Sequence, residues 1–395
     1  MENTIAIISQ KLSGGGAERV ASNLSLELSK YYDVVLILFD GKNRAYLNGG
    51  KLIDLGIPAD SRMLNKAYNF FRRIVEVKKI KRIYHPVCTI SLLDGPNLVN
   101  ILSKHNDIII TSNRSVVSES INKKYQPKFL IKFIADRSDK VISLSKAVKF
   151  DLVKNFSISS SKIDVIYNSC DGERLMALSE KDDGGQSLYE NKRPYIVTMG
   201  RLVLPKGQWH LIRVFSALHK LMPDLELVIL GQGELQERLE ELAKEYNIFE
   251  NVKFLGYINN PHYIIKNAKL FVFSSIYEGL GNSLLEALAC GKAIISADSI
   301  GGPKEILAPD IDHKITSVEY AQYGVLVPAF TYAEFDSSTP LTQEEKMMAD
   351  AIIEILNNKV LREEYEEKAK IRAKDFTPEV INTKWRDVIE KLGTK

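Results

Sequence analysis

The sequence predicts an α/β protein of two domains, each with a parallel β-sheet covered by helices. Short apolar segments alternate with helical patterns along the whole chain, which is typical of parallel α/β sheets. The 395 residues are enough for two domains with a core each. The charge also divides the chain, since residues 1–170 contain 26 Lys and Arg against 15 Asp and Glu, and the rest contains 27 against 35. The basic first half predicts contact with an anionic surface or ligand.

Six strands are expected in each domain. In the first domain they span residues 4–9, 34–39, 88–93, 108–112, 141–144 and 165–167. In the second they span residues 195–199, 225–230, 252–255, 270–273, 293–296 and 325–327. Two Rossmann-like domains follow, with ligands expected at the carboxyl ends of the strands, in a crevice between the domains.

The domain boundaries follow from composition. Segment 171–193 is rich in Asp, Gly, Ser and Glu and is interpreted as a linker, so the domains are expected at 1–170 and 194–376. The last segment, 377–395, begins Thr-Pro-Glu and predicts a helix. Its apolar face contains Val380, Ile381, Trp385, Val388 and Ile389.

Composition excludes several classes of protein. No apolar run approaches the ~20 residues of a membrane span, and no signal-peptide pattern precedes the first strand, so we expect a cytoplasmic protein. Cys88, Cys170 and Cys290 are scattered within or beside apolar runs, which favours buried thiols over disulfides. The six histidines lack metal-ligand spacing, and we expect neither a metal nor another cofactor.

Glu278 and Glu286 form the most informative motif, with the expected strand 270–273 before them. A helix is expected over 283–289, ending at Gly291, so Glu278 follows a strand and Glu286 lies one turn into the helix. Gly279 and Gly281 let the backbone approach a ligand. The amides of Asn282, Ser283 and Leu284 are expected to open toward an anion at the helix N-terminus. Carboxylates beside a phosphate site suit sugar hydroxyls, so the motif predicts a nucleotide-sugar site; an ordinary acidic helix is the alternative.

Arg201 and Lys206 lie on a short loop, Gly200 to Gly207, after the first strand of the second domain. A guanidinium can donate two hydrogen bonds to phosphate oxygens, and an ammonium adds a point charge. Two cations on one loop can stabilise a diphosphate leaving group. The alternative is a solvated basic turn.

Two glycine-rich turns follow other strands. Gly231-Gln-Gly233 lies after segment 225–230, where a plain strand-to-helix connection is an equally good interpretation. Gly14-Gly15-Gly16-Ala17-Glu18-Arg19 follows the first strand and opens a helix, but it lacks the G-x-G-x-x-G spacing of a dinucleotide site.

Taken together, these motifs resemble those of the retaining GT4 glycosyltransferases, which have the two-domain GT-B fold. The spacing of Glu278 and Glu286 resembles their E-x7-E motif, in which the first Glu contacts the donor hexose and the second the ribose. The Arg201–Lys206 loop resembles their diphosphate clamp, and the Gly15-Gly16 loop resembles one that closes over the donor. The resemblance implies two sheets facing across a cleft and a last helix that returns to the first domain. It names Glu278, Arg201 and Lys206 as catalytic. The implied donor contacts are Gly15, Gly16, Gly200, Arg201, Lys206, Gly233, Glu278, Gly279, Leu280, Gly281, Asn282, Ser283, Leu284 and Glu286.

Residues 62–82 predict a basic amphipathic helix. They contain eight Lys or Arg and one Glu, and Met63, Ala67, Phe70, Ile74 and Val77 recur at helical spacing. Such a helix can contact an anionic membrane or a lipid-linked diphosphate, although a core helix with solvated lysines gives the same pattern. No nucleic-acid motif accompanies the charge.

Three arginines are candidates for acceptor binding. Arg72 and Arg73 lie on this helix, and Arg114 follows the strand 108–112. A structural role for Arg114 stays open. Asp310 and Asp312 have D-x-D spacing without a preceding strand, and we interpret them as an exposed turn.

The resemblance implies transfer of a hexose or N-acetylhexosamine from a nucleotide sugar, UDP-linked, with retention of configuration. The implied acceptor is a growing glycan on polyprenyl diphosphate, at the inner face of the cell membrane. A soluble synthase of the sucrose or glycogen type, or a non-catalytic nucleotide-binding protein, is the alternative.

Overall fold

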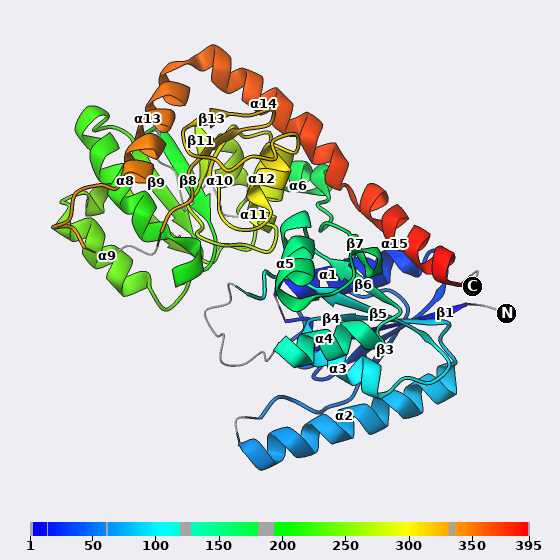
Figure 1. Cartoon of the computed structure of the whole chain (residues 1–395). Helices are drawn as coiled ribbons and strands as arrows, with labels where there is room; N and C mark the ends of the chain where they lie inside the picture. The colour runs from blue at the N-terminus through cyan, green and yellow to red at the C-terminus, as the bar shows by residue number, and fades with distance from the viewer. Residues whose placement is uncertain are drawn as a thin grey trace. The chain divides into compact units, whose positions relative to one another are not determined.

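The chain forms two compact units with one parallel sheet each (Figure 1). The structure is a computed structural model that describes residues 3–13, 15–60, 62–118, 128–180, 193–331 and 336–393. Unit 1 comprises residues 1–169 and 378–395, and unit 2 comprises residues 170–377.

Unit 1 contains a seven-stranded parallel sheet in the order β3-β2-β1-β4-β5-β6-β7. Its strands are β1 (Thr4–Ser9), β2 (Asp33–Leu38), β3 (Lys51–Asp54), β4 (Cys88–Leu92), β5 (Ile108–Asn113), β6 (Lys140–Ser143) and β7 (Ile163–Val165). Its helices are α1 (Gly16–Leu28), α2 (Met63–Tyr84), α3 (Asp94–Leu102), α4 (Lys128–Arg137), α5 (Lys146–Phe156), the 3-10 turn η1 (Ser160–Lys162) and α15 (Pro378–Gly393).

The last helix, α15, belongs to unit 1. Figure 1 shows it in red beside α1, which it contacts. Ile381, Trp385, Val388 and Ile389 are buried in one core with residues of β1 and β4, whereas Val380 is exposed. The predicted apolar face therefore completes the core of the first unit.

Unit 2 contains the order β10-β9-β8-β11-β12-β14-β13, parallel except for β13 at the edge. Its strands are β8 (Tyr195–Met199), β9 (Glu226–Leu230), β10 (Val252–Gly256), β11 (Leu270–Phe273), β12 (Ile294–Ala297), β13 (Glu319–Tyr320) and β14 (Val325–Val327). Its α-helices are α6 (Gly172–Ser179), α8 (Gln208–Leu221), α9 (Gln236–Glu245), α10 (His262–Asn267), α11 (Asn282–Ala289), α12 (Pro303–Leu307), α13 (Gln343–Asn357) and α14 (Lys359–Ala373). The 3-10 turns are η2 (Leu204–Lys206), η3 (Phe249–Asn251) and η4 (Lys374–Phe376).

Part of the segment interpreted as a linker is a helix of unit 2. The Asp171 side chain accepts a hydrogen bond from the amide of Arg174 and starts α6, which contacts α10 and α11. The polar composition that suggested a linker here provides a helix cap instead. The rest of the expected linker, 181–192, lies outside the described residues.

Each sheet reverses its strand order at one place, between β1 and β4 in unit 1 and between β8 and β11 in unit 2. In open α/β sheets, ligands bind beyond the carboxyl ends of the strands at such a point. The two most informative motifs follow β8 and β11, so this point in unit 2 is where a site is expected. No helix in the described ranges is both long enough and apolar enough to cross a membrane.

Candidate functional site

The loops after β8 and β11 are joined directly to each other. The amide of Ile276 donates to the carbonyl of Pro205 at 2.9 Å, and Ser274 Oγ donates to the carbonyl of Lys206 at 3.2 Å. Gly207 packs on the backbone of Ser274. These contacts fix the basic loop against the loop that contains Glu278.

Lys206 and Glu278 form an ion pair across this junction, through Nζ and Oε1. Ser275 Oγ also donates to Glu278 Oε1, at 2.9 Å. The two side chains remain 20% and 12% exposed, so the pair is accessible to a ligand. The structure therefore brings together two of the three residues named as catalytic, 72 positions apart in the chain.

The main chain of Glu278 is held by the loop after β12. Its amide donates to the carbonyl of Ile300 at 2.9 Å, next to a bridge between Tyr277 and Ile300. Gly301 has a φ of 132°, and a Cβ there would lie 1.9 Å from the carbonyl oxygen of Glu278. Only glycine fits this approach. The sequence did not predict Gly301 as part of the site, because its contact with Glu278 joins the loops after β12 and β11, which are apart in the chain.

Glu286 lies one turn into α11, as expected, and is largely buried. Its Oε2 is 3.2 Å from Nε2 of His262, the first residue of α10. The sequence assigned no role to His262 and gives no signal that pairs it with Glu286.

The start of α11 differs in detail from the expectation. Gly281 is the N-cap residue, but the amide of Leu284 donates to the carbonyl of Gly281 at 3.0 Å. The amide of Leu284 thus closes the first turn of α11, and its contact with an anion stays a prediction. The side chains of Leu280 and Leu284 are in the core, Ser283 is 8% exposed, and Gly279 and Asn282 are half-buried.

Arg201 is exposed at the start of the basic loop, next to half-buried Gly200. Its carbonyl accepts a hydrogen bond from Gln208 at 2.9 Å. Across the described ranges, no side chain pairs with its guanidinium, so the charge is available to a ligand.

Gly233 has a packing reason for being glycine. A Cβ at this position would lie 2.2 Å from the carbonyl oxygen of Leu202. Leu202 in turn donates its amide to the carbonyl of Gln232 at 3.0 Å. The Gly231–Gly233 turn thus supports the loop that contains Arg201, which favours the structural interpretation of this motif.

In unit 1, the glycine loop is held by a side chain of the helix that follows it, α1. Gly15 is the N-cap of α1 and Gly16 its first residue, and both are exposed. The Glu18 carboxylate accepts hydrogen bonds from the amide of Ser13, from Ser13 Oγ at 3.3 Å and from the amide of Gly15 at 3.4 Å. Gly14 lies outside the described residues.

Arg114 lies at the carboxyl end of β5 and is half-buried. Its guanidinium donates to Asn168 Oδ1 and, at 3.3 Å, to Ser112 Oγ. No carboxylate in the described part of the chain pairs with it, and burial lowers the pKa of Arg114 to about 10. Arg114 is thus a partly desolvated cation at the carboxyl end of the strands of this sheet.

Arg72 and Arg73 have different surroundings on α2. Arg73 donates to the carbonyl of Ile57 through Nε at 3.1 Å and Nη2 at 2.8 Å, and its guanidinium lies over Phe39. These contacts fix α2 to the unit, and the suggested role of Arg73 in acceptor binding stays a prediction. Arg72 is exposed, with its guanidinium 5.6 Å from the Tyr68 ring centre.

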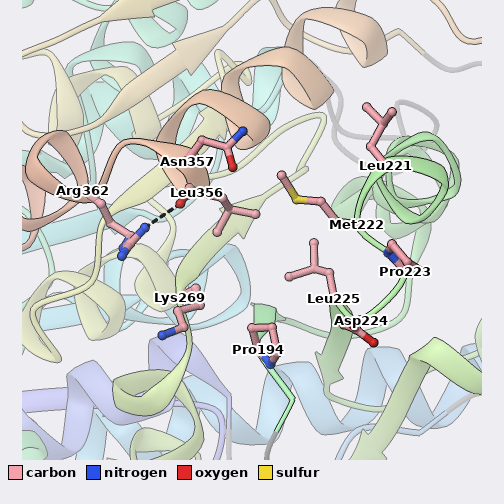
Figure 2. Close-up of a pocket in the computed structure, with 10 residues that line it drawn as sticks. All are labelled: Pro194, Leu221, Met222, Pro223, Asp224, Leu225, Lys269, Leu356, Asn357 and Arg362. Atoms are coloured by element: carbon pink, nitrogen blue, oxygen red, sulfur yellow. Dashed lines mark hydrogen bonds between the residues drawn. The ribbon is translucent and has the colours of Figure 1, made fainter.

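The cavity drawn in Figure 2 is at the other end of the unit 2 strands. Pro194, Leu225 and Lys269 line it and directly precede β8, β9 and β11, and its volume is about 420 Å³. Arg362 points to the Leu356 carbonyl, to which it donates at 2.9 Å. None of the predicted site residues lines this cavity.

Metal-ligating groups do not gather in the described residues: no three His, Cys, Asp or Glu side chains lie together. Asp310 and Asp312 are exposed, as expected.

Comparison with known proteins identifies the two halves separately. Residues 14–174 match the family model described as Glycosyltransferase Family 4. Residues 180–322 match the model described as Glycosyl transferases group 1.

Relatives match over most of their length. An uncharacterized glycosyltransferase of Methanocaldococcus jannaschii is 33% identical over 82% of this chain and 84% of its own. The N-acetylgalactosamine-N,N'-diacetylbacillosaminyl-diphospho-undecaprenol 4-alpha-N-acetylgalactosaminyltransferase of Campylobacter jejuni is 30% identical over 94% of this chain and 95% of its own. Among solved structures, a sucrose-phosphate synthase of Thermosynechococcus elongatus superposes with a TM-score of 0.77 over 99% of both chains at 18% identity, which shows a shared GT-B fold.

Proposed function

The chain belongs to glycosyltransferase family 4, and we propose that it transfers a hexose or N-acetylhexosamine from a UDP-sugar to a glycan on polyprenyl diphosphate. The observation that carries the proposal is the contact of Lys206 with Glu278 at the point where the unit 2 sheet reverses its order. The name of the Campylobacter relative describes a sugar transferase acting on a diphospho-undecaprenol-linked acceptor, which supports the acceptor class.

In the proposed reaction, the diphosphate of the donor approaches Arg201 and Lys206. Lys206 then exchanges part of its contact with Glu278 for the diphosphate, and Glu278 becomes available to a hydroxyl of the donor sugar. Positive charge held where the leaving group develops negative charge lowers the barrier. Glu286 accepts hydrogen bonds from the ribose, as the family resemblance implies.

We propose front-face attack with retention of configuration. The acceptor oxygen bonds to the anomeric carbon while the bond from that carbon to the diphosphate oxygen breaks. The proton of the acceptor hydroxyl passes to the departing diphosphate. Holding both substrates in this geometry is the main contribution of the protein.

A panel of nucleotide sugars tests the reaction. We expect nucleoside diphosphate release with one or a few UDP-sugars, dependent on a polyprenyl-diphosphate-linked acceptor, and a product with the anomeric configuration of the donor by NMR. Release should persist in EDTA, because we assign the positive field to Arg201, Lys206 and the start of α11. The proposal would be contradicted if none of the nucleotide sugars supported release of a nucleoside diphosphate. It would also be contradicted if the product had the opposite anomeric configuration to the donor.

We assign Arg114 to the acceptor side. Its hydrogen bonds go to the neutral oxygens of Ser112 and Asn168, so its charge suits an anionic group of the acceptor. Arg114→Gln should raise the KM of a diphosphate-linked acceptor and leave the donor KM unchanged. An equal rise for both substrates would remove the assignment.

We propose that α2 places unit 1 on an anionic membrane, and the exposure of its first half supports this. Met63 and Leu64 are 85% exposed, and Tyr68 and Phe71 are 64% exposed. Phe70 of the first half packs on the sheet together with Ile74, Val77 and Ile80 of the second half. Met63 and Ala67, which belong to the same apolar pattern, are exposed and do not pack in the core. Apolar side chains among exposed basic residues suit a membrane surface.

Liposome sedimentation tests this surface. Arg72 and Lys79, with Lys66 and Arg82, are exposed, and each charge near an anionic surface contributes ~1 kcal/mol. Replacing these four by Gln should weaken binding to phosphatidylserine-containing vesicles and lower its salt sensitivity. A matched control replaces four exposed lysines of unit 2, Lys220, Lys359, Lys370 and Lys374, by Gln. If both variants bind as the parent does, α2 is only a core helix with a solvated face, and if the parent itself does not bind, a soluble synthase is favoured.

A further inference from the structure

The Glu286 carboxylate is held by a histidine that no sequence motif assigns to the site. Its Oε2 lies 3.2 Å from His262 Nε2, and the two side chains are only 10% and 8% exposed. A hydrogen bond to a charged group in such surroundings is stronger than one between neutral groups.

The other side of the imidazole is fixed by Asn260. His262 Nδ1 is 2.9 Å from Asn260 Oδ1, and Asn260 Nδ2 donates to the carbonyl of Leu178 at 2.9 Å. Because the amide nitrogen faces a carbonyl, the amide oxygen faces the histidine and accepts from it. Both ring nitrogens of His262 therefore face oxygen atoms, and the ring lies between Asn260 and Glu286.

The main chain of His262 is also restrained. It begins α10, which contacts α6 and α11, and its carbonyl lies 4.0 Å from Cys290 Sγ. Leu178, at the far end of the bridge, belongs to α6. The bridge thus connects three helices and ends on the carboxylate.

We propose that His262 is a positioning residue of the donor site, which fixes the Glu286 carboxylate so that it accepts hydrogen bonds from the ribose hydroxyls of the nucleotide. This inference rests on the proposed function and extends it to a residue that does not itself touch the donor. A carboxylate oxygen has two lone pairs, so a bond from His262 leaves the group able to accept from a ligand.

Two amide substitutions separate the halves of the bridge. His262→Gln can place an amide nitrogen near the position of Nε2, and His262→Asn can place one near Nδ1. We expect His262→Asn to raise the donor KM about tenfold, the equivalent of one hydrogen bond to a charged group, with kcat within about twofold. His262→Gln should keep the donor KM within about threefold of the parent, since a neutral donor still reaches Glu286.

A donor without ribose hydroxyls shows whether the effect passes through Glu286. The parent and His262→Asn are compared with a UDP-sugar and with its 2′,3′-dideoxyuridine analogue. If His262 positions Glu286 for the ribose, the difference in KM between the two proteins disappears with the analogue. A double-mutant cycle of His262→Asn and Glu286→Gln should likewise show a strong coupling.

Thermal unfolding of each variant provides the folding control. If His262→Asn does not fold, Asn260→Ala removes the acceptor at Nδ1 and should raise the donor KM with the same dependence on the ribose hydroxyls. An unchanged donor KM in a folded His262→Asn variant, or an equal rise with the dideoxy analogue, would overturn the positioning role. In either of these two outcomes the parent protein is still active. If the proposed function itself is wrong, the parent releases no nucleoside diphosphate, so the two failures can be told apart.

Discussion

Arg201 and Lys206 lie on one loop but in different electrostatic surroundings. Lys206 is paired with Glu278, whereas Arg201 is exposed without a partner among the described side chains. In the proposed reaction, the donor diphosphate would therefore meet the unpaired charge of Arg201 and would have to displace Glu278 from Lys206. The motif predicts the same diphosphate contact for both residues, but the structure shows that only Lys206 has a carboxylate partner among the described side chains.

Removing either cation should slow transfer by about a hundredfold or more, because each stabilises charge that develops only on the leaving group. Steady-state kinetics of Arg201→Ala and Lys206→Ala at saturating donor measures this. Lys269→Ala, at the opposite end of the strands, is the matched control and should retain parental turnover. Near-parental turnover in either of the first two variants would remove the diphosphate assignment.

The two glutamates should separate kinetically. Glu278→Gln should mainly lower kcat, because contacts to the transferred sugar change as charge develops on it. Glu286→Gln should mainly raise the donor KM, because the ribose contact persists through the reaction. The parameters come from donor titrations at saturating acceptor, and the reverse pattern would mean that the two roles are exchanged.

At the scale of elements, most of the fold could be predicted from apolar periodicity. Every predicted strand is present: β1, β8, β11 and β14 have the predicted ends, and the ends of the others differ by one or two residues. The two strands not predicted are edge strands: β3 begins and ends in the charged residues Lys51 and Asp54, and β13 has two residues. Neither has the continuous apolar run of a central strand, which is buried on both faces.

The residues of the candidate site that belong to local sequence motifs were predicted. Glu278, Glu286, Arg201 and Lys206 all lie at the carboxyl end of the unit 2 sheet, where their positions after strands placed them. His262 and Gly301 were not predicted, because each acts across a tertiary contact. The bond from the Leu284 amide to the Gly281 carbonyl was not predicted either, although it is local and closes the first helical turn.

The elements α8 and α13 meet at a buried charge cluster. Glu345 Oε1 lies 2.8 Å from both Arg213 Nε and His210 Nδ1, and the three side chains are at most 1% exposed. Burial alone would raise the pKa of Glu345, but hydrogen bonds from His210, Arg213 and the Thr342 amide outweigh it and lower the pKa. The folded protein therefore binds a proton here less readily than the unfolded chain.

Glu345→Gln should destabilise unit 2 by about 3–5 kcal/mol at neutral pH, because it leaves buried Arg213 without its counter-charge. Since the folded pKa is lowered, the contribution of Glu345 is complete above the ordinary carboxyl pKa of about 4.3 and is lost as the pH falls through the folded value. Urea unfolding should show a difference between parent and variant that is constant near neutral pH and shrinks below about pH 4. A difference independent of pH would contradict this ionisation.

At the scale of the whole molecule, each unit contains one of the two tryptophans. Trp209 is in the core of unit 2 and Trp385 is in the core of unit 1, on α15, and both are at most 2% exposed. Tryptophan fluorescence can therefore report on the units one at a time.

Single-tryptophan variants should resolve two unfolding transitions. In Trp209→Phe, the remaining signal should follow unit 1, and in Trp385→Phe it should follow unit 2. Adding Ile381→Ala to Trp209→Phe should shift the unit 1 transition by about 2–5 kcal/mol, and adding it to Trp385→Phe should leave the unit 2 transition unchanged. Equal shifts in both backgrounds would mean that the units unfold together.

Assigning α15 to unit 1 also has a consequence for synthesis on the ribosome. Unit 2 is continuous from residue 170 to 377, whereas unit 1 is completed only by residues 378–395. Domains fold as units while the chain emerges, the N-terminal one usually first. Here unit 1 emerges first, but its core is completed only when α15 emerges. Until then, the apolar surface that packs against Trp385 is exposed to solvent. The nascent chain should therefore resist proteolysis first in the unit that is translated second.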